Sequence, residues 1–481
     1  MVELRRELGL KEVVATIVTG VIGGGLFISA IQIQSDTPIG SGIILAFILA
    51  AIPSIIIAMC YAVLAPIFPK SGGEYVFVSR ILDPYIGFIA TWARWFAMIA
   101  TIAAMAVGDV ILIQNFFNMA GLQDVASFIT VNIQLIAIVL VLIFLIINDL
   151  GIKIYGRVQT GMFVLLMIGI GALILFGLPH VSMENLSSSF TFDVSSLVKA
   201  SSLVFFGYIG FAAIANAGGE VKNPEKVLPK GIIISMLTIA IMYVLVVVVT
   251  YGSMSPEFYA SYDFSTGSIP DVMSHFLPGI IALYVAFAGA VAIISDINPN
   301  ILATSRLSFA WAKDKIVPQK LAELNRHGVP RWTLLVNGVL AIAIILLANQ
   351  FMAAVMMINM AVLLVYLAVT TSALILPYKH PEIYRKATFK FKGLWIAAVI
   401  GMTLSLLFFG VILRLPDAFP GFILLVVWSA IGTVVYVLTL EHHKTYWKVQ
   451  KQQRKEKDIA DKELIKQLVD IEKEKISKKK K

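Results

Sequence analysis

Apolar stretches of about 20 residues recur along almost the whole of this 481-residue chain, and a helix of that length crosses the ~30 Å hydrocarbon core of a bilayer. About twelve segments meet this length criterion. They lie near 12–33, 41–66, 84–119, 125–147, 152–177, 196–216, 231–253, 278–312, 331–349, 352–377, 393–414 and 418–438. Charged residues make up only 14% of the chain, against about a quarter in soluble proteins. The sequence therefore predicts an all-α polytopic membrane protein with about twelve transmembrane helices.

Lysine and arginine are concentrated in alternate connections between these segments. The rich connections hold Lys70 and Arg80; Lys153 and Arg157; Lys222, Lys226 and Lys230; Lys313, Lys315, Lys320, Arg326 and Arg331; and Lys379, Arg385, Lys386, Lys390 and Lys392. The connections 34–40, 178–195 and 254–277 hold neither residue. The positive-inside rule then predicts a multi-pass plasma-membrane protein with both termini cytoplasmic. Because the net charge of +9 is a topology signal, no nucleic-acid partner is expected.

The two ends of the chain differ from the apolar middle. Residues 1–11 precede the first apolar segment without a small-residue cleavage site, so we expect a retained cytoplasmic N-terminus. Residues 439–481 are rich in Lys, Glu and Gln and form a predicted cytoplasmic tail, either a helix on the anionic leaflet or a solvated segment. Cys60 is the only cysteine, so no intrachain disulfide and no cysteine-based metal site are expected.

Two apolar segments are interrupted by glycine. Residues 19–27 read Thr-Gly-Val-Ile-Gly-Gly-Gly-Leu-Phe, and residues 205–211 read Phe-Phe-Gly-Tyr-Ile-Gly-Phe. Unwound backbone survives in a bilayer only where a cavity, a ligand or neighbouring protein satisfies its polar groups. Interrupted segments at corresponding places in two halves of a chain are typical of the substrate site of a secondary transporter. The alternative is that these glycines only allow close helix packing.

The order of the segments predicts two inverted repeats. Residues 12–177 hold segments 1–5 and residues 196–377 hold segments 6–10. An odd number of spans separates the two glycine interruptions, so the halves have opposite orientations. Each half also has an unusually long third segment, 84–119 or 278–312. Segments 11 and 12, at 393–438, lie outside this repeat.

Several motifs, in order, resemble the amino acid-polyamine-organocation superfamily of permeases. Residues 20–27 resemble its first-segment pattern G-x-I-G-x-G-I-F, and residues 69–75 its P-x-S-G-G-x-Y connection. Further similar blocks are Asn148, Gly151, Val158 and Gln159; residues 206–211; residues 220–224 with Pro229; Thr304, Ser305 and Arg306; and residues 312–314 with Pro318, Val329 and Pro330. Together these blocks extend over most of residues 1–440.

The resemblance implies a LeuT-like fold of five-plus-five inverted repeats, with discontinuous helices 1 and 6, which carries an amino acid by alternating access. Glycine N–H groups near a positive half-helix end suit an α-carboxylate, and the carbonyls freed in the sixth segment suit an α-ammonium. The expected substrate-binding residues are Gly23, Gly24, Gly25, Phe206, Gly207, Tyr208 and Ile209. Tyr208 or Phe211 could cap the substrate, or lie in the core or against lipid.

Asp296, over halfway along the eighth segment, is the candidate coupling residue. A carboxylate in hydrocarbon usually faces a partner or a water-filled cavity. Asp296 could bind a proton, or it could ligate sodium with Ser295 and the carbonyls near Thr19 and Ile22; no cofactor besides this coupling H⁺ or Na⁺ is expected. The alternative is a structural ion pair with Arg94. Otherwise we expect Arg94 to extend to the cytoplasmic interface, and Asp109, near a segment end, to be solvated.

The sequence departs from the superfamily pattern at Ala212 and Gly219, where many relatives carry acidic residues. Less negative charge favours a neutral amino acid over a cationic one. The leading hypothesis is a secondary active transporter for neutral amino acids, coupled to a proton or sodium gradient. The alternatives are a cationic amino acid or polyamine permease or exchanger, and an amino acid sensor (transceptor). No catalytic cluster stands out, so an enzyme is not expected.

Overall fold

The computed structural model describes residues 4–347, 351–385, 387–415 and 418–440, so nearly all of the predicted tail lies outside the described residues. In this part of the chain every regular element is helical. The only β-type pairings found there are two isolated bridges, Leu8 with Val221 and Ser71 with Ala217. The prediction of an all-α membrane protein is therefore confirmed at the level of fold class.

The following helices account for the predicted segments in order, the first and sixth segments being divided into short pieces. They are α1 (Leu10–Thr19), α2 (Gly24–Phe27) and α3 (Ser29–Asp36) for the first segment, then α4 (Ile43–Ile67), α6 (Pro84–Met119), α7 (Gln123–Val131), α8 (Ile133–Asp149), α9 (Ile152–Gly177), α11 (Val194–Val204), α12 (Ala213–Asn216), α13 (Pro224–Ser253), α16 (Gly279–Lys313), α17 (Arg331–Leu347), α18 (Phe351–Lys379), α20 (Leu394–Ile412) and α21 (Ala418–Leu438). Shorter helices connect them: α5 (Gly73–Ile81), α10 (Met183–Ser188), α14 (Pro256–Ser261), α15 (Ile269–Ser274) and α19 (Pro381–Arg385).

Within the described residues, ten helices are long and apolar enough to cross a membrane. An eleventh is reached if α7 and α8, which meet at 85°, count as one bent span. The predicted segment 331–349 is α17, an apolar helix of 17 residues that falls short of the same length criterion. The count of twelve spans therefore stays a prediction.

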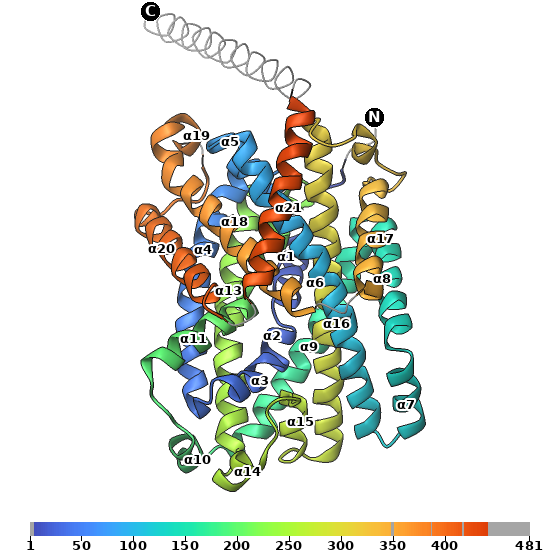
Figure 1. The fold of residues 1–481 in the computed structure, drawn as a ribbon, viewed down its shortest axis with the longest axis vertical. Coiled ribbons are helices and arrows are strands. Elements are labelled where there is room, and N and C mark those ends of the chain that lie inside the picture. Colours follow the sequence, from blue (N-terminus) through green and yellow to red (C-terminus); the bar gives the residue numbers. More distant parts are fainter. Residues whose placement is uncertain (1–3, 348–350, 386, 416–417, 441–481) are drawn as a thin grey trace, which may run out of the picture.

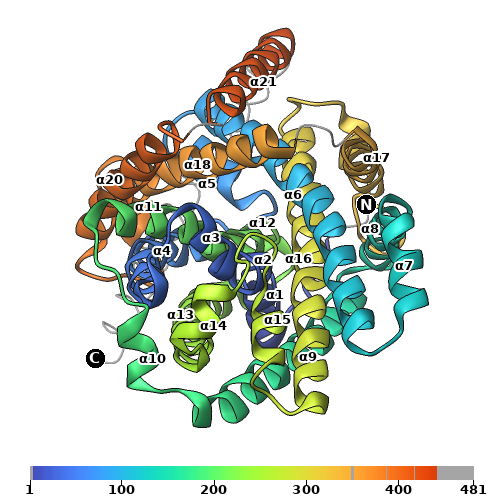
Figure 2. The ribbon, with the colours of Figure 1, turned by 60° about the horizontal axis from the view of Figure 1, so that its bottom comes forward.

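The long helices surround the first segment and the sixth. Figure 2 shows α2, α3 and α12 near the centre, with α4, α13, α9, α16, α6 and α18 around them. The last two helices, α20 and α21, lie at the periphery, as do α7, α8 and α17. The described chain begins and ends at the same end of the molecule (Figure 1).

Local sequence signals set where the helices begin. The Asp83 carboxylate accepts a hydrogen bond from the Tyr85 N–H at 2.8 Å, and Pro84 occupies the first turn of α6, where its missing N–H costs nothing. Small residues then let the helices approach closely. A Cβ at Gly169 on α9 would lie 2.1 Å from the Ala288 Cβ on α16, so these two helices touch through a glycine and an alanine.

Candidate functional site

Both glycine-rich stretches depart from α-helix in the structure. Helix α1 ends at Thr19, and α2 begins at Gly24 after a non-helical stretch. In the sixth segment α11 ends at Val204, and residues 205–212 form a 3₁₀ helix, η3 (Phe205–Ala212), before α12. Such departures expose backbone polar groups that a ligand can use.

The two departures lie directly against each other. A Cβ at Gly25 would lie 2.4 Å from the Gly207 Cα, and a Cβ at Gly210 would lie 1.4 Å from the Gly20 carbonyl oxygen. Only glycine therefore fits at Gly25 and Gly210 without movement of the backbone. The Tyr243 hydroxyl, on α13, lies 2.7 Å from the carbonyl oxygens of both Val21 and Gly207 and bridges the two stretches. Sequence reasoning missed Tyr243, although a tyrosine in an aliphatic segment is a usable signal.

A cavity of about 1190 Å³ opens beside these two stretches. Of the predicted substrate-binding residues, its wall includes Gly23, Gly24, Gly25, Phe206, Gly207 and Ile209. Residues from α6, α16 and α18 also line it, among them Thr101, Met105, Asp296, Asn300 and Asn359, as do residues of α3, α11 and α17. The structure thus brings most of the predicted set around one space, while binding itself stays a prediction.

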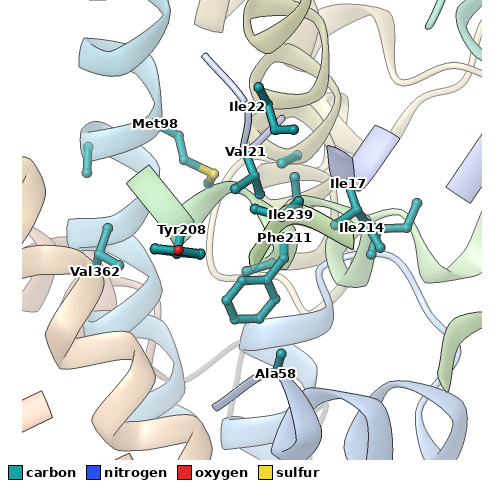
Figure 3. Packing of buried hydrophobic residues seen from close by; sticks show 14 of the residues in the cluster. Ile17, Val21, Ile22, Ala58, Met98, Tyr208, Phe211, Ile214, Ile239 and Val362 are labelled. Atoms are coloured by element: carbon teal, nitrogen blue, oxygen red, sulfur yellow. The ribbon is translucent and has the colours of Figure 1, made fainter. Parts of the chain in front are cut away.

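Tyr208 is placed differently from its neighbours in this set. It is fully buried and is not among the residues that line the cavity, and its hydroxyl donates to the Phe47 carbonyl at 3.1 Å. Phe211 is also in the core, stacked on Tyr366 with ring centroids 5.6 Å apart. Figure 3 shows both rings within the cluster of buried apolar residues. Of the roles considered for the two rings, these positions fit the core.

One end of the cavity reaches the surface of the molecule. It is lined there by the exposed Asp36 and the half-buried Lys199, whose ammonium donates to the Asp36 carbonyl at 3.2 Å. Arg306 follows the cavity-lining Asn300 on α16 but is not itself part of the lining. Its guanidinium donates to both Glu220 carboxylate oxygens, at 2.7 and 2.8 Å, in a fully buried ion pair. A second ion pair joins Arg80 to Asp314, with 2.7 Å between a guanidinium nitrogen and a carboxylate oxygen.

The predicted coupling-ion residues fall into two groups. Thr19 and Ser295 are fully buried between α1, α9 and α16, where the Gln159 amide donates to the Thr19 hydroxyl and, at 2.8 Å, to the Ser295 carbonyl. The Gln159 oxygen accepts from Asn298 at 2.7 Å. An uncharged donor thus partners the Thr19 hydroxyl and the Ser295 carbonyl. The Thr19 carbonyl, which was expected near a sodium ion, accepts from the Ser295 hydroxyl at 3.4 Å.

Asp296 and Ile22 complete the predicted set. Asp296 lines the cavity, and its carboxylate accepts from the Asn300 amide at 3.0 Å. A Cβ at Gly23 would lie 3.8 Å from the Asp296 Cβ, so the carboxyl group stands beside the unwound glycines. Ile22 is fully buried, and its side chain is not part of the cavity wall.

Two expectations about charged residues were wrong. Arg94 does not extend to the interface: it is 4% exposed, lines the cavity, and its Nε has no hydrogen-bond partner among the described residues. Ion pairs within the described chain do not include Arg94 with Asp296. Asp109 is not solvated but fully buried. In both cases α6 packs against neighbouring helices along most of its length, which position in the sequence alone did not indicate.

Helices of membrane-spanning length around a central cavity, part of whose wall is unwound backbone, define the class of polytopic membrane transport proteins. The chain belongs to the amino acid permease family, whose model matches residues 8–439. This confirms the resemblance predicted from the motifs. Relatives of this family are transporters and permeases rather than enzymes.

Three relatives illustrate the range of the family. The chain is 28% identical to the methylthioribose transporter of Bacillus subtilis, over 88% of this chain and 91% of the relative. It is 27% identical to the branched-chain amino acid permease BcaP of the same bacterium, over 92% and 94%. It is also 27% identical to the vacuolar cationic amino acid transporter 4 of Arabidopsis thaliana, over 79% of this chain and 64% of the relative.

Proposed function

We propose that this protein is a secondary active transporter that moves neutral amino acids across the plasma membrane by alternating access. One observation carries the proposal: the two unwound stretches meet at Gly25 and Gly207 and face one cavity. Unwound backbone from two segments is what a zwitterionic ligand needs, because N–H groups and carbonyls are then available together. Similarity to a branched-chain amino acid permease supports the neutral class.

The substrate would lie across the two stretches. Its α-carboxylate would bind the N–H groups of Gly24 and Gly25 at the start of α2, and its α-ammonium the carbonyls of η3. Tyr243 and Tyr366 donate to the Gly207 and Ile209 carbonyls at 2.7 and 2.9 Å and so fix their orientation. A site whose backbone is held in place before binding loses less conformational entropy when the ligand arrives.

The proposed architecture is a twelve-span, LeuT-like protein with inverted repeats at 12–177 and 196–377 and both termini cytoplasmic. The open end of the cavity then faces outwards, because its residues adjoin the connections without lysine or arginine. The Arg306–Glu220 pair closes the cytoplasmic end. Coupling to protons is favoured over sodium, because the Gln159 amide already partners Thr19 and Ser295.

A second candidate is a permease for cationic amino acids or polyamines. The Asp296 carboxylate in the cavity wall favours it, as does similarity to a cationic amino acid transporter. Arg94 in the same wall argues against it, because its guanidinium keeps its positive charge and repels a second cation.

Uptake of radiolabelled amino acids into liposomes containing the purified protein tests the proposal. Unlabelled neutral amino acids, lysine, arginine, polyamines and methylthioribose serve as competitors, with proton and sodium gradients imposed separately. Accumulation competed by neutral amino acids supports the main proposal, and competition by lysine supports the second candidate. Uptake that requires internal substrate indicates an exchanger. Saturable binding without flux under any gradient would contradict transport and favour a sensor.

A further inference from the structure

We propose that Asp109, on α6, is a proton-binding residue of the transport cycle. The inference rests on the proposed transport function and adds a residue to it. Asp109 is fully buried, and neither of its carboxylate oxygens has a hydrogen-bond partner among the described residues. Gly108, the residue before Asp109, and Ile111, two residues after it, both line the cavity.

The packing around Asp109 fixes which way its face of α6 points. Met105 lies one turn earlier on the same face, and Leu112 nearly one turn later. Leu112 packs with Ala290 and Ile293 of α16, and Met105 packs against this same cluster. Asp109 therefore lies within the contact between α6 and α16.

This contact also reaches the unwound glycines. A Cβ at Gly24 would lie 3.8 Å from the Met105 sulfur and 4.0 Å from the Ile293 Cδ1. Asp296 follows Ile293 by one turn of α16 and stands beside Gly23. The two carboxyl groups thus flank the first glycine stretch on neighbouring helices, with Asp109 displaced towards the open end of the cavity.

An ionised carboxylate without a hydrogen-bond donor is among the least favourable groups that can be buried in protein. The group must therefore carry a proton or hold a cation. A sodium ion requires several oxygen ligands. The side chains one turn on either side of Asp109 on α6, Met105 and Leu112, instead join an apolar cluster with Ala290 and Ile293 of α16. This apolar setting favours the proton over a sodium ion.

The charged groups of the neighbouring helices do not give the Asp109 carboxylate a positive counter-charge in place of that proton. Asp296 of α16 faces the same contact, and its negative charge adds to the cost of ionising Asp109. Tyr284 of α16 is engaged elsewhere, since its hydroxyl donates to the Leu165 carbonyl at 3.2 Å. On α6 itself the nearest cation is Arg94, about four turns away. Of the remaining charged residues of the helices packed on α6, Arg306 is paired with Glu220. The others lie near helix ends: Glu74, Arg80, Asp124, Asp149, Lys313, Arg331 and Lys379.

The proposed step is reversible proton binding, with no other bond made or broken. A proton from the outer solution enters through the cavity and binds the Asp109 carboxylate, which becomes a neutral carboxylic acid while the cavity is open outwards. When the cavity closes and the inner end opens, the proton leaves to the cytoplasm. Because Asp296 lies one turn further inwards, it is the next acceptor on that route.

The test compares Asp109→Asn, Asp109→Glu and Asp124→Asn with wild type in proteoliposomes. Asp109→Asn removes the titratable group at similar volume, Asp109→Glu keeps it, and Asp124 is an exposed acidic residue on α7. Two readouts are taken for each protein. One is substrate accumulation driven by an inward proton gradient, with acidification of the vesicle lumen followed by a dye. The other is counterflow exchange without a gradient, which requires substrate movement but no net proton movement.

We expect Asp109→Asn to retain counterflow but to lose gradient-driven accumulation and substrate-dependent acidification. Asp109→Glu and Asp124→Asn should keep all three. Normal gradient-driven accumulation by Asp109→Asn overturns the inference, as does loss of counterflow in a folded Asp109→Asn protein. Wild-type exchange that ignores the proton gradient overturns the inference but leaves the proposed transport intact. Absence of both uptake and exchange in wild type means that the proposed function itself has failed.

Discussion

Gly24 and Gly25 are adjacent in the sequence but face different surroundings. A Cβ at Gly25 would lie 2.4 Å from the backbone of Gly207, whereas a Cβ at Gly24 would meet the Met105 sulfur at an ordinary 3.8 Å. A methyl group at Gly25 could be accommodated only by moving the backbone of η3, whereas the Met105 side chain can change conformation to accommodate one at Gly24. At the scale of single residues, the shape of the site depends on Gly25, which touches the backbone of the other stretch, more than on Gly24, which touches a side chain.

We expect Gly25→Ala to reduce substrate affinity strongly, because the added methyl group forces the two unwound stretches apart at a cost of about 1–3 kcal/mol. Gly24→Ala should stay close to wild type. Equilibrium binding of labelled substrate to detergent-purified protein measures both. Equal affinities for the two variants would show that contact between the stretches does not shape the site.

At the scale of elements, polar side chains hold α1, α8, α9 and α16 together. The Gln159 amide joins Thr19 of α1 to Ser295 of α16, and Asn298 links Gln159 to Asn148 of α8 at 2.7 Å. All of these side chains are buried. Such a network fixes the relative positions of helices that apolar packing alone would leave freer to slide.

We predict that Gln159→Ala lowers the melting temperature of the purified protein. The substitution leaves buried partners unpaired, at about 1–3 kcal/mol for each group. Thermal unfolding followed by tryptophan fluorescence checks this, with the exposed Gln123→Ala as the control. If the two variants melt at the same temperature, the network does not stabilise the bundle.

The buried pair between Arg306 of α16 and Glu220 is the closure that we propose for the cytoplasmic end of the cavity. Glu220 also accepts hydrogen bonds at its backbone carbonyl from the N–H groups of Glu7 and Leu8, at 2.9 and 3.0 Å, so the N-terminal segment is part of this closure. Removing one partner of a buried ion pair leaves the other charge uncompensated.

We therefore expect Glu220→Gln to weaken the closed end by about 3–5 kcal/mol. A cysteine placed at Ser71, next to the closure, should react faster with a cytoplasmic-side thiol reagent in this variant. The background is Cys60→Ser, which removes the chain's single cysteine. Glu184→Gln, at an exposed position, serves as the control. Unchanged labelling at Ser71 would mean that the ion pair does not hold this end shut.

At the scale of the whole molecule, the cavity runs from the unwound glycines to Asp36 and Lys199, while the Arg306–Glu220 pair, which we propose as the closure of the other end, lies outside its lining. One access route open and the other closed is what alternating access requires of a single conformation. The helices α20 and α21 lie at the periphery (Figure 2), and no residue of either is among those that line the cavity.

Gly108 lines the cavity and has no atom within 4 Å of an added Cβ, so a cysteine fits there without strain. We expect Gly108→Cys, in the Cys60→Ser background, to be labelled by an impermeant maleimide from outside and to be protected by substrate. Lys320→Cys, in a connection on the opposite side, should be labelled from inside only. Labelling of Gly108→Cys from the cytoplasmic side alone would reverse the proposed orientation.

The sequence by itself determined the all-helical membrane fold class, the two interrupted segments and the family. These features depend on the length of apolar segments, on glycine and on short motifs, all of which are local in the chain. Even so, length and hydropathy could not tell a straight span from the 85° bend between α7 and α8.

Only the tertiary structure decided which side chains face the cavity. Tyr208 and Gly207 are neighbours in η3, but Gly207 lines the cavity while Tyr208 donates to Phe47. Arg94 and Asp109 likewise became buried because α6 packs against other helices through most of its turns. The direction of a side chain depends on which helices pack on either side of it, and those contacts join residues far apart in the sequence.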